Sequence, residues 1–227
     1  MPMRQKAMFV MLALAAVLLV RNLYTISVLP DEVNQGQIFR IIFFHVPAAI
    51  AAMVGSAVAL VASVLFLWKR NFQYDALAVA VTEVGLAFLA VNLVTGSIWA
   101  RVIWGVWWAW DPRLTSALIC WILYAGYLIL RQALEEPTQR ATFAAVYSIF
   151  AFTDVPIVYF SIRWWRTIHP QPVFFSKDGY FPPDWSRALL INMVAIFLLY
   201  AVLTMIRLRQ EQTQREIDYL RRTVHAI

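Results

Sequence analysis

The sequence predicts an all-α polytopic membrane protein with six transmembrane helices and both termini in the cytoplasm. Hydrophobic residues make up 62% of the 227 residues and charged residues only 14%, a composition too apolar for an ordinary water-soluble fold. A helix needs about 20 apolar residues to cross roughly 30 Å of hydrocarbon, because every backbone N–H and C=O must be paired where no water reaches. Six segments of the chain meet this length. We therefore expect residues 1–227 to form a single six-helix membrane domain.

The six segments follow one another with little chain between them. The first, residues 7–29, comes after the basic residues Arg4 and Lys6 like a secretory signal, but no small-x-small cleavage site follows it, so we expect a retained helix. Residues 207–227 alternate charges of both signs at helical spacing, which predicts a cytoplasmic helical tail on the last span. The other spans, each bounded by charges or prolines, are expected at 41–68, 76–99, 114–130, 141–160 and 188–206.

The basic residues set the expected orientation. An even number of spans places both termini on one side, and that side holds more lysine and arginine than the other, as expected of the cytoplasmic side. Orientation and anionic lipid account for most of the net charge of +6, so no nucleic-acid partner is expected. The opposite, periplasmic side still carries an unusual set of basic residues, namely Arg40, Arg101, Arg113, Arg163, Arg166, Lys177 and Arg187.

The composition also excludes several kinds of site. Cys120 is the only cysteine, so the chain cannot form an internal disulfide, a CxxC redox pair, a cysteine-based zinc site or a CxxCH motif. No serine nucleophile, phosphate-binding loop or carboxylate pair is arranged for hydrolysis. We therefore do not expect an enzyme.

Two of the three histidines lie at the periplasmic ends of predicted spans. His45, in FFHVPAA, is near the start of the second span, and His169, in WWRTIHPQP, lies just beyond the fifth. One histidine in a membrane segment is as readily an interhelical hydrogen-bonding residue as a ligand, but two on the same side favour a shared site. Only folding can bring them together across 124 residues, as it does for axial haem ligands on separate helices. His225 lies in the polar tail and is expected to be solvated.

The most informative segment is residues 99–113, which contains five tryptophans within twelve residues. Tryptophan at a membrane interface commonly forms an aromatic belt, but a belt needs only one or two per helix end. A dense indole surface suits a large, flat, apolar ligand, because rigid aromatic faces bury area at low entropic cost. A porphyrin is such a ligand, and we expect this segment to be its periplasmic platform.

Porphyrin propionates require cationic hydrogen-bond donors. Arg40, Arg101 and Arg113 lie beside His45 or within the tryptophan-rich segment, and we expect them to bind the propionates, which would explain the surplus of periplasmic arginines. Asp111 is expected to orient an indole N–H or to pair with an arginine.

At these residues the sequence resembles the haem-handling WWD family of membrane proteins, and within it the CcmC family of bacterial cytochrome c maturation. The resemblance rests on WGVWWAWDPRLTS, flanked in order by FFHVPAA and WWRTIHPQP, and it covers nearly the whole chain in length and span layout. It implies an inner-membrane protein that binds haem b non-covalently, with His45 and His169 as the iron ligands. It further implies a haem platform formed by Trp104, Gly105, Trp107, Trp108, Trp110 and Asp111.

The same resemblance implies the activity and the partners. Members of the family deliver haem at the periplasmic face to a membrane-tethered haem chaperone, CcmE. An ABC-type complex, CcmA/CcmB, and a small membrane protein, CcmD, accompany this step. Two imidazoles would keep the iron coordinatively closed while one porphyrin edge stays open to a partner.

Two other functions remain open from the sequence. A b-type electron-transfer protein would use the same two histidines, but it often carries a second ligand pair across the bilayer, for which no histidine is left. A small-molecule transporter is suggested by Glu83 and Asp154, two carboxylates inside predicted spans. A buried interhelical hydrogen bond explains each carboxylate at least as well.

Overall fold

The computed structural model describes residues 3–170 and 181–225 and confirms an all-helical protein with six stretches able to cross a membrane. Lys177 lies outside the described residues, as does the side chain of His225. α5 and α6 together form the fifth span, and a short 3₁₀ helix, η1 (Gln37–Ile41), precedes the second. The α-helices are α1 (Met3–Val28), α2 (Ile42–Lys69), α3 (Phe72–Ile103), α4 (Pro112–Ala133), α5 (Pro137–Phe152), α6 (Asp154–Trp164) and α7 (Pro183–His225).

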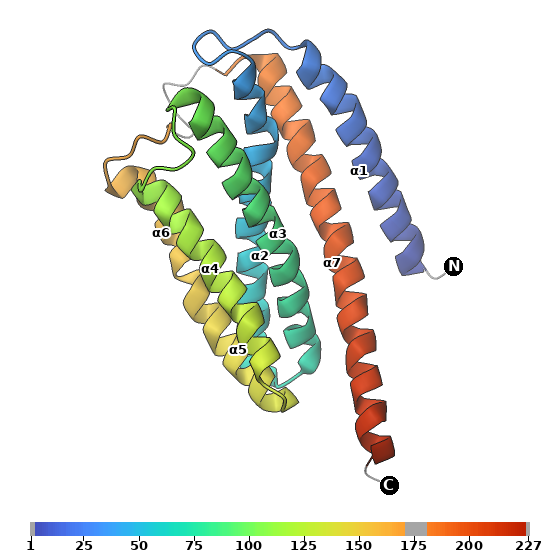
Figure 1. The fold of residues 1–227 in the computed structure, drawn as a ribbon. Helices are drawn as coiled ribbons and strands as arrows, with labels where there is room; N and C mark the ends of the chain where they lie inside the picture. The colour runs from blue at the N-terminus through green and yellow to red at the C-terminus, as the bar shows by residue number, and fades with distance from the viewer. Residues whose placement is uncertain (1–2, 171–180, 226–227) are drawn as a thin grey trace.

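Successive spans run in opposite directions, so the two termini lie at the same end of the bundle (Figure 1). We call this the terminal end, and we call the opposite end, with residues 104–111 and 165–170, the site end. α2 and α3 make the most extensive helix contact and form the centre, while α1 packs on α7 and α4 packs on α6. That the terminal end faces the cytoplasm stays a prediction.

The expected fifth helix, residues 141–160, is divided at Thr153 into α5 and α6. Pro156 accounts for the break, because it has no N–H to bond the carbonyl of Phe152 and its ring crowds that carbonyl. The turn tightens there, and the Thr153 N–H bonds the Phe150 carbonyl at 3.0 Å. α4 packs against both halves, whereas α2 packs against α5 but makes little contact with α6. This leaves space between α2 and α6 at the site end.

A second proline, Pro47, shapes α2 next to His45. Pro47 is buried within the helix and leaves the Phe43 carbonyl without its usual backbone partner. The side-chain amide of Asn192, from α7, donates a hydrogen bond to this carbonyl. Asn192 in turn accepts a hydrogen bond from Asn22 of α1 at 3.2 Å. This chain of buried amides ties α1, α7 and α2 together beside His45.

Charged residues hold the terminal end of the bundle together. Arg131 of α4 is only 7% exposed and donates two hydrogen bonds to Asp75 of α3, at 2.6 and 3.1 Å. Arg215 of α7 donates to the same carboxylate at 2.6 Å and pairs with Glu211 at 2.7 Å. The polar extension of α7 is therefore fixed to α3 and α4.

Candidate functional site

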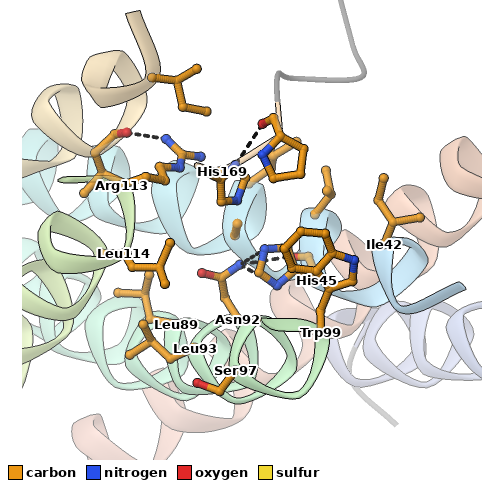
Figure 2. A pocket seen from close by; sticks show the side chains of 18 of the residues that line it. Ile42, His45, Leu89, Asn92, Leu93, Ser97, Trp99, Arg113, Leu114 and His169 are labelled. Atoms are coloured by element: carbon orange, nitrogen blue, oxygen red, sulfur yellow. Dashed lines mark hydrogen bonds between the residues drawn. The ribbon is translucent and has the colours of Figure 1, made fainter. Parts of the chain in front are cut away.

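A cavity of about 310 Å³ lies at the site end between α2, α3, α4 and α6. Leu89, Leu93 and Leu114 contribute to its largely apolar wall (Figure 2). The structure thus brings the two candidate histidines, 124 residues apart in sequence, to one cavity (Figure 2). Among the residues predicted to bind a cofactor, those that line it are His45, Trp104, Trp108, Arg113 and His169.

The rest of the predicted platform does not line this cavity. Trp107 and Trp110 are 59% and 79% exposed. Gly105 has a φ of 74°, a left-handed conformation that favours glycine and lets the chain turn after α3. Part of the tryptophan-rich segment is therefore turned outward from the bundle.

Side chains of α3 hold His45 in place. His45 Nδ1 lies 3.0 Å from Thr95 Oγ1. Asn92 Nδ2 lies 3.2 Å from Nδ1, 3.1 Å from Nε2 and 3.2 Å from the His45 carbonyl oxygen. Gly96 faces the ring so closely that a Cβ there would lie 3.1 Å from His45 Cε1. Asn92, Thr95 and Gly96, here called the His45 cradle, form one face of α3 that fits the imidazole.

The hydrogen bonds of Thr95 indicate which His45 nitrogen carries the proton. The Thr95 hydroxyl donates to the Val91 carbonyl at 2.7 Å, and a hydroxyl has only one hydrogen to give. Thr95 therefore accepts a hydrogen bond from Nδ1–H of His45. With Nδ1 protonated, Nε2 keeps its lone pair and accepts from the Asn92 side-chain amide, whose Nδ2 lies 3.1 Å away.

His169 has the same protonation, fixed by a different partner. Its Nδ1 lies 2.8 Å from the Pro170 carbonyl oxygen, which can only accept, so Nδ1 carries the proton and Nε2 keeps a lone pair. Burial lowers the pKa of His169 below its ordinary value, the Pro170 carbonyl opposes this, and the positive charge of Arg113 lowers the pKa further. The imidazole is consequently neutral at pH 7, the form in which histidine binds a metal.

Asp111 fixes the segment that carries His169. Its carboxylate accepts hydrogen bonds from the Thr167 hydroxyl at 2.7 Å and from the Ile168 N–H at 2.9 Å, and it caps α4 by accepting from the Arg113 N–H at 2.9 Å. Burial raises the pKa of Asp111, but these three hydrogen bonds lower it by more, and the net pKa lies below the ordinary value. These partners differ from the indole N–H or arginine side chain expected from the sequence.

Of the three arginines expected to bind propionates, Arg113 lines the cavity. Its guanidinium donates to a backbone carbonyl of α6. Arg40 instead donates to two carbonyls at the end of α1, at 3.0 and 2.6 Å, and pairs with Asp31 at 2.8 Å. Arg101 donates to the Gly105 carbonyl. Arg40 and Arg101 therefore hold the chain segments around the site.

The indoles near the cavity include one unpaired donor. Trp99 and Trp104 pack edge to face with ring centroids 4.8 Å apart, and the Trp99 N–H donates to Gln35 at 2.7 Å. Nε1 of Trp108 is buried and, among the described residues, has no hydrogen-bond partner. Because an unpaired buried donor is costly, Trp108 at the cavity wall indicates a ligand with an acceptor atom.

Three residues of the site were not singled out by the sequence: Asn92, Thr95 and Arg163. Arg163 lines the cavity and lies over an aromatic ring of its own helix at 5.9 Å. A signal for the first two exists, because positions 92, 95 and 99 put polar or indole groups on one face of an apolar helix. No comparable pattern distinguishes Arg163 from the neighbouring Arg166.

Over most of its length the sequence is similar to known proteins of one kind. The sequence model of the CcmC family, described as heme exporter protein C, matches residues 1–223. A heme exporter protein C of Bradyrhizobium diazoefficiens is 36% identical over 210 residues, which cover 92% of this chain and 80% of that protein. A heme exporter protein C of Escherichia coli K12 is 32% identical over 199 residues, 87% of this chain and 80% of the relative.

Proposed function

Because the chain belongs to the CcmC family of haem exporter proteins and is a multi-pass protein of the bacterial inner membrane, we propose that it holds haem b at its site end and delivers it for cytochrome c maturation. His45 and His169 are the proposed axial ligands. When bound there, haem supplies an iron with two axial positions and two propionates.

The observation that carries this proposal is that two imidazoles line one cavity, each with Nδ1 beside an oxygen atom. Each donates Nδ1–H to an oxygen, His45 to the Thr95 hydroxyl and His169 to the Pro170 carbonyl. Each therefore presents Nε2 as a lone pair, which is how histidine ligands are commonly oriented for a metal. Two such ligands would fill both remaining positions of a haem iron, and neither histidine would need to act as an acid or base.

The described walls also fit the rest of a porphyrin. Apolar side chains of the cavity would cover its faces, and the unpaired N–H of Trp108 would donate a hydrogen bond to one of its oxygens. We assign the propionates to Arg113 and Arg163, since both line the cavity. Arg40 and Arg101 are left out of this assignment because neither of them lines the cavity.

Delivery requires a surface for a partner beside the cavity. Trp107 and Trp110 expose their indoles at the site end, and exposed tryptophans are favoured at protein interfaces. We propose that they contact the periplasmic haem chaperone CcmE. CcmA/CcmB and CcmD are proposed as partners from family membership alone.

The two rival functions gain less support. Within the described residues no second pair of histidines faces another cavity, as a transmembrane electron carrier often requires. Glu83, one of the two carboxylates that suggested a transporter, is paired with Arg207 and thus links α3 to α7.

Absorption spectroscopy of the purified protein tests the proposed function. His45→Ala and His169→Ala should each remove the bis-histidine haem bands and stop transfer to the chaperone, while the protein still inserts into the membrane. His225→Ala is the matched control and should leave the bands unchanged. Normal bands and normal chaperone loading in either site variant would refute the ligand assignment. If haem stayed bound in the presence of the chaperone and could be reduced and reoxidised, the result would favour a function in electron transfer.

A further inference from the structure

A second hollow, of about 740 Å³, lies between α1 and α7 at the terminal end, far along the bundle from the histidines. Its α1 wall consists of Arg4, Gln5 and Met8, and its α7 wall runs from Met205 to Ile217. Because α1 packs on the bundle through α7, this groove lies at the edge of the molecule, where lipid has access to it.

The groove carries positive charge that the protein does not neutralise. Arg4 and Arg209 line it, and none of its described lining residues is a carboxylate. In the described part of the chain neither arginine makes an ion pair, unlike Arg207 and Arg215, which pair with acids on another face of α7. Two cations without acidic partners are thus presented to one space.

The lining also changes in polarity along the bundle axis. Met8, Met205 and Ile206 lie toward the apolar spans, whereas the part of α7 beyond Arg209 contributes amides, a hydroxyl and, at its far end, the side chain of Ile217. Up to Gln214 the lining thus passes from an apolar wall to two guanidinium groups and then to neutral polar side chains. A phospholipid changes in the same order, from acyl chain to phosphate to headgroup.

We propose that this groove binds an anionic phospholipid, with its phosphate between Arg4 and Arg209 and an acyl chain along Met8, Met205 and Ile206. Guanidinium groups bind phosphate through paired hydrogen bonds. A free phosphate would use the arginines but leave the apolar wall uncovered, which is why the occupant is a lipid. The proposal does not depend on haem binding, so His45→Ala should leave lipid binding unchanged.

Native mass spectrometry of the whole protein, released from detergent with added phosphatidylglycerol or phosphatidylcholine, tests this site. Wild type should retain phosphatidylglycerol in preference to phosphatidylcholine. The double variant Arg4→Gln, Arg209→Gln should bind phosphatidylglycerol roughly ten- to thirty-fold more weakly, with phosphatidylcholine binding unchanged. Lys6→Gln is the control, since Lys6 is exposed on the same turn of α1 but does not line the groove. Unchanged thermal unfolding in detergent would show that the double variant is folded.

Four results would overturn the proposal. The first is an unchanged preference for phosphatidylglycerol in the double variant. The second is an equal loss of binding in Lys6→Gln, which would mean a diffuse surface-charge effect. The third is displacement of phosphatidylglycerol by inorganic phosphate at an equal concentration, which would mean an anion site without lipid selectivity. The fourth is displacement by a lower concentration of an acidic peptide such as oligoglutamate, which would indicate a protein partner.

Discussion

At the scale of single residues, the site depends on which nitrogen of each imidazole is protonated. The Thr95 hydroxyl, on the neighbouring helix α3, accepts Nδ1–H of His45. The carbonyl of Pro170, the next residue in the chain, accepts Nδ1–H of His169. Thr95 does not line the cavity, and Pro170 lines it without a side-chain group that could bind haem. In the proposed haem site both act through the histidines, as groups behind metal ligands commonly do.

Thr95→Val tests this role, because valine has nearly the same shape but cannot accept a hydrogen bond. We expect haem affinity to fall about 10- to 100-fold, the usual cost of removing a group that orients a ligand. Thr95→Ser keeps the hydroxyl and should retain near-normal affinity. Haem titration followed by absorption and electron paramagnetic resonance spectra would measure both effects. Equal affinity in Thr95→Val and wild type would contradict the inferred proton position.

Asp111→Asn tests how the His169 segment is held. The pKa of Asp111 is lower than its ordinary value, so its charge stabilises this segment above the unfolded pKa of about 3.9 and the benefit is lost as pH falls through the folded value. The substitution should therefore loosen residues 167–169 at pH 7 and make less difference in strong acid. Hydrogen exchange of the Ile168 amide should rise several-fold, and haem affinity should fall with it.

Asp184→Asn provides the control for Asp111→Asn. Asp184 is an exposed acid that pairs with Arg187, three residues later on the same helix. It should change neither the exchange of Ile168 nor haem binding. If the Ile168 amide exchanged equally slowly in Asp111→Asn and in wild type at pH 7, backbone contacts alone would hold residues 167–169.

The sequence predicted the two histidines because few residues of that type occur in the chain, and two of them lie at the same side of the membrane. It could not predict which arginines face the cavity. Arg40 and Arg113 were both predicted to bind propionates because each is a basic residue near a candidate site segment. In the structure Arg40 bonds to carbonyls at the end of α1, whereas Arg113 lines the cavity. Contacts between segments distant in sequence determine this difference.

At the scale of elements, the divided fifth span creates room for the site. Mean hydropathy averages over many residues, so it identifies the span as a whole. For the same reason it does not reveal the single backbone hydrogen bond that is missing at Pro156. Pro156 was visible in the sequence, but a proline within a span can bend it in any of several ways. That α4 follows both halves of the span while α2 follows only α5 is set by packing between helices.

Pro156→Ala should have opposite effects on stability and on haem binding. Alanine restores the hydrogen bond to Phe152 and should stabilise the span by up to about 3 kcal/mol. A continuous helix would bring α6 toward α2 and narrow the cavity, so haem affinity should fall. Thermal unfolding in detergent and haem titration would measure the two effects. A stabilised variant with unchanged haem affinity would show that the break is unimportant for the cavity.

At the scale of the whole molecule, helices distant in sequence are joined by polar groups in an otherwise apolar interior. The Asn22, Asn192 and Phe43 contacts join three helices near the site end, and the Asp75 cluster joins three at the terminal end. The sequence shows each of these polar residues inside or beside a span but does not show their partners. Pairing of this kind is a property of the assembled bundle.

Arg131→Met should destabilise the protein strongly, because it leaves Asp75 buried with less compensation. Breaking a buried ion pair by removing one partner costs about 3–5 kcal/mol. The double variant Arg131→Met, Asp75→Leu removes both charges and should recover part of this loss. Chemical unfolding of the single and double variants would measure the difference. If the double variant lost the sum of the two single losses, Arg131 and Asp75 would be independent of each other.

α7 is one unbroken helix from Pro183 to His225, and at 1.5 Å per residue its 43 residues extend about 64 Å (Figure 1). Near one end Asn192 bonds to the helix that carries His45, and toward the other Arg215 bonds to Asp75. Because the helix is continuous between these two contacts, it sets the spacing between the Asp75 cluster and the Phe43 carbonyl, two residues before His45.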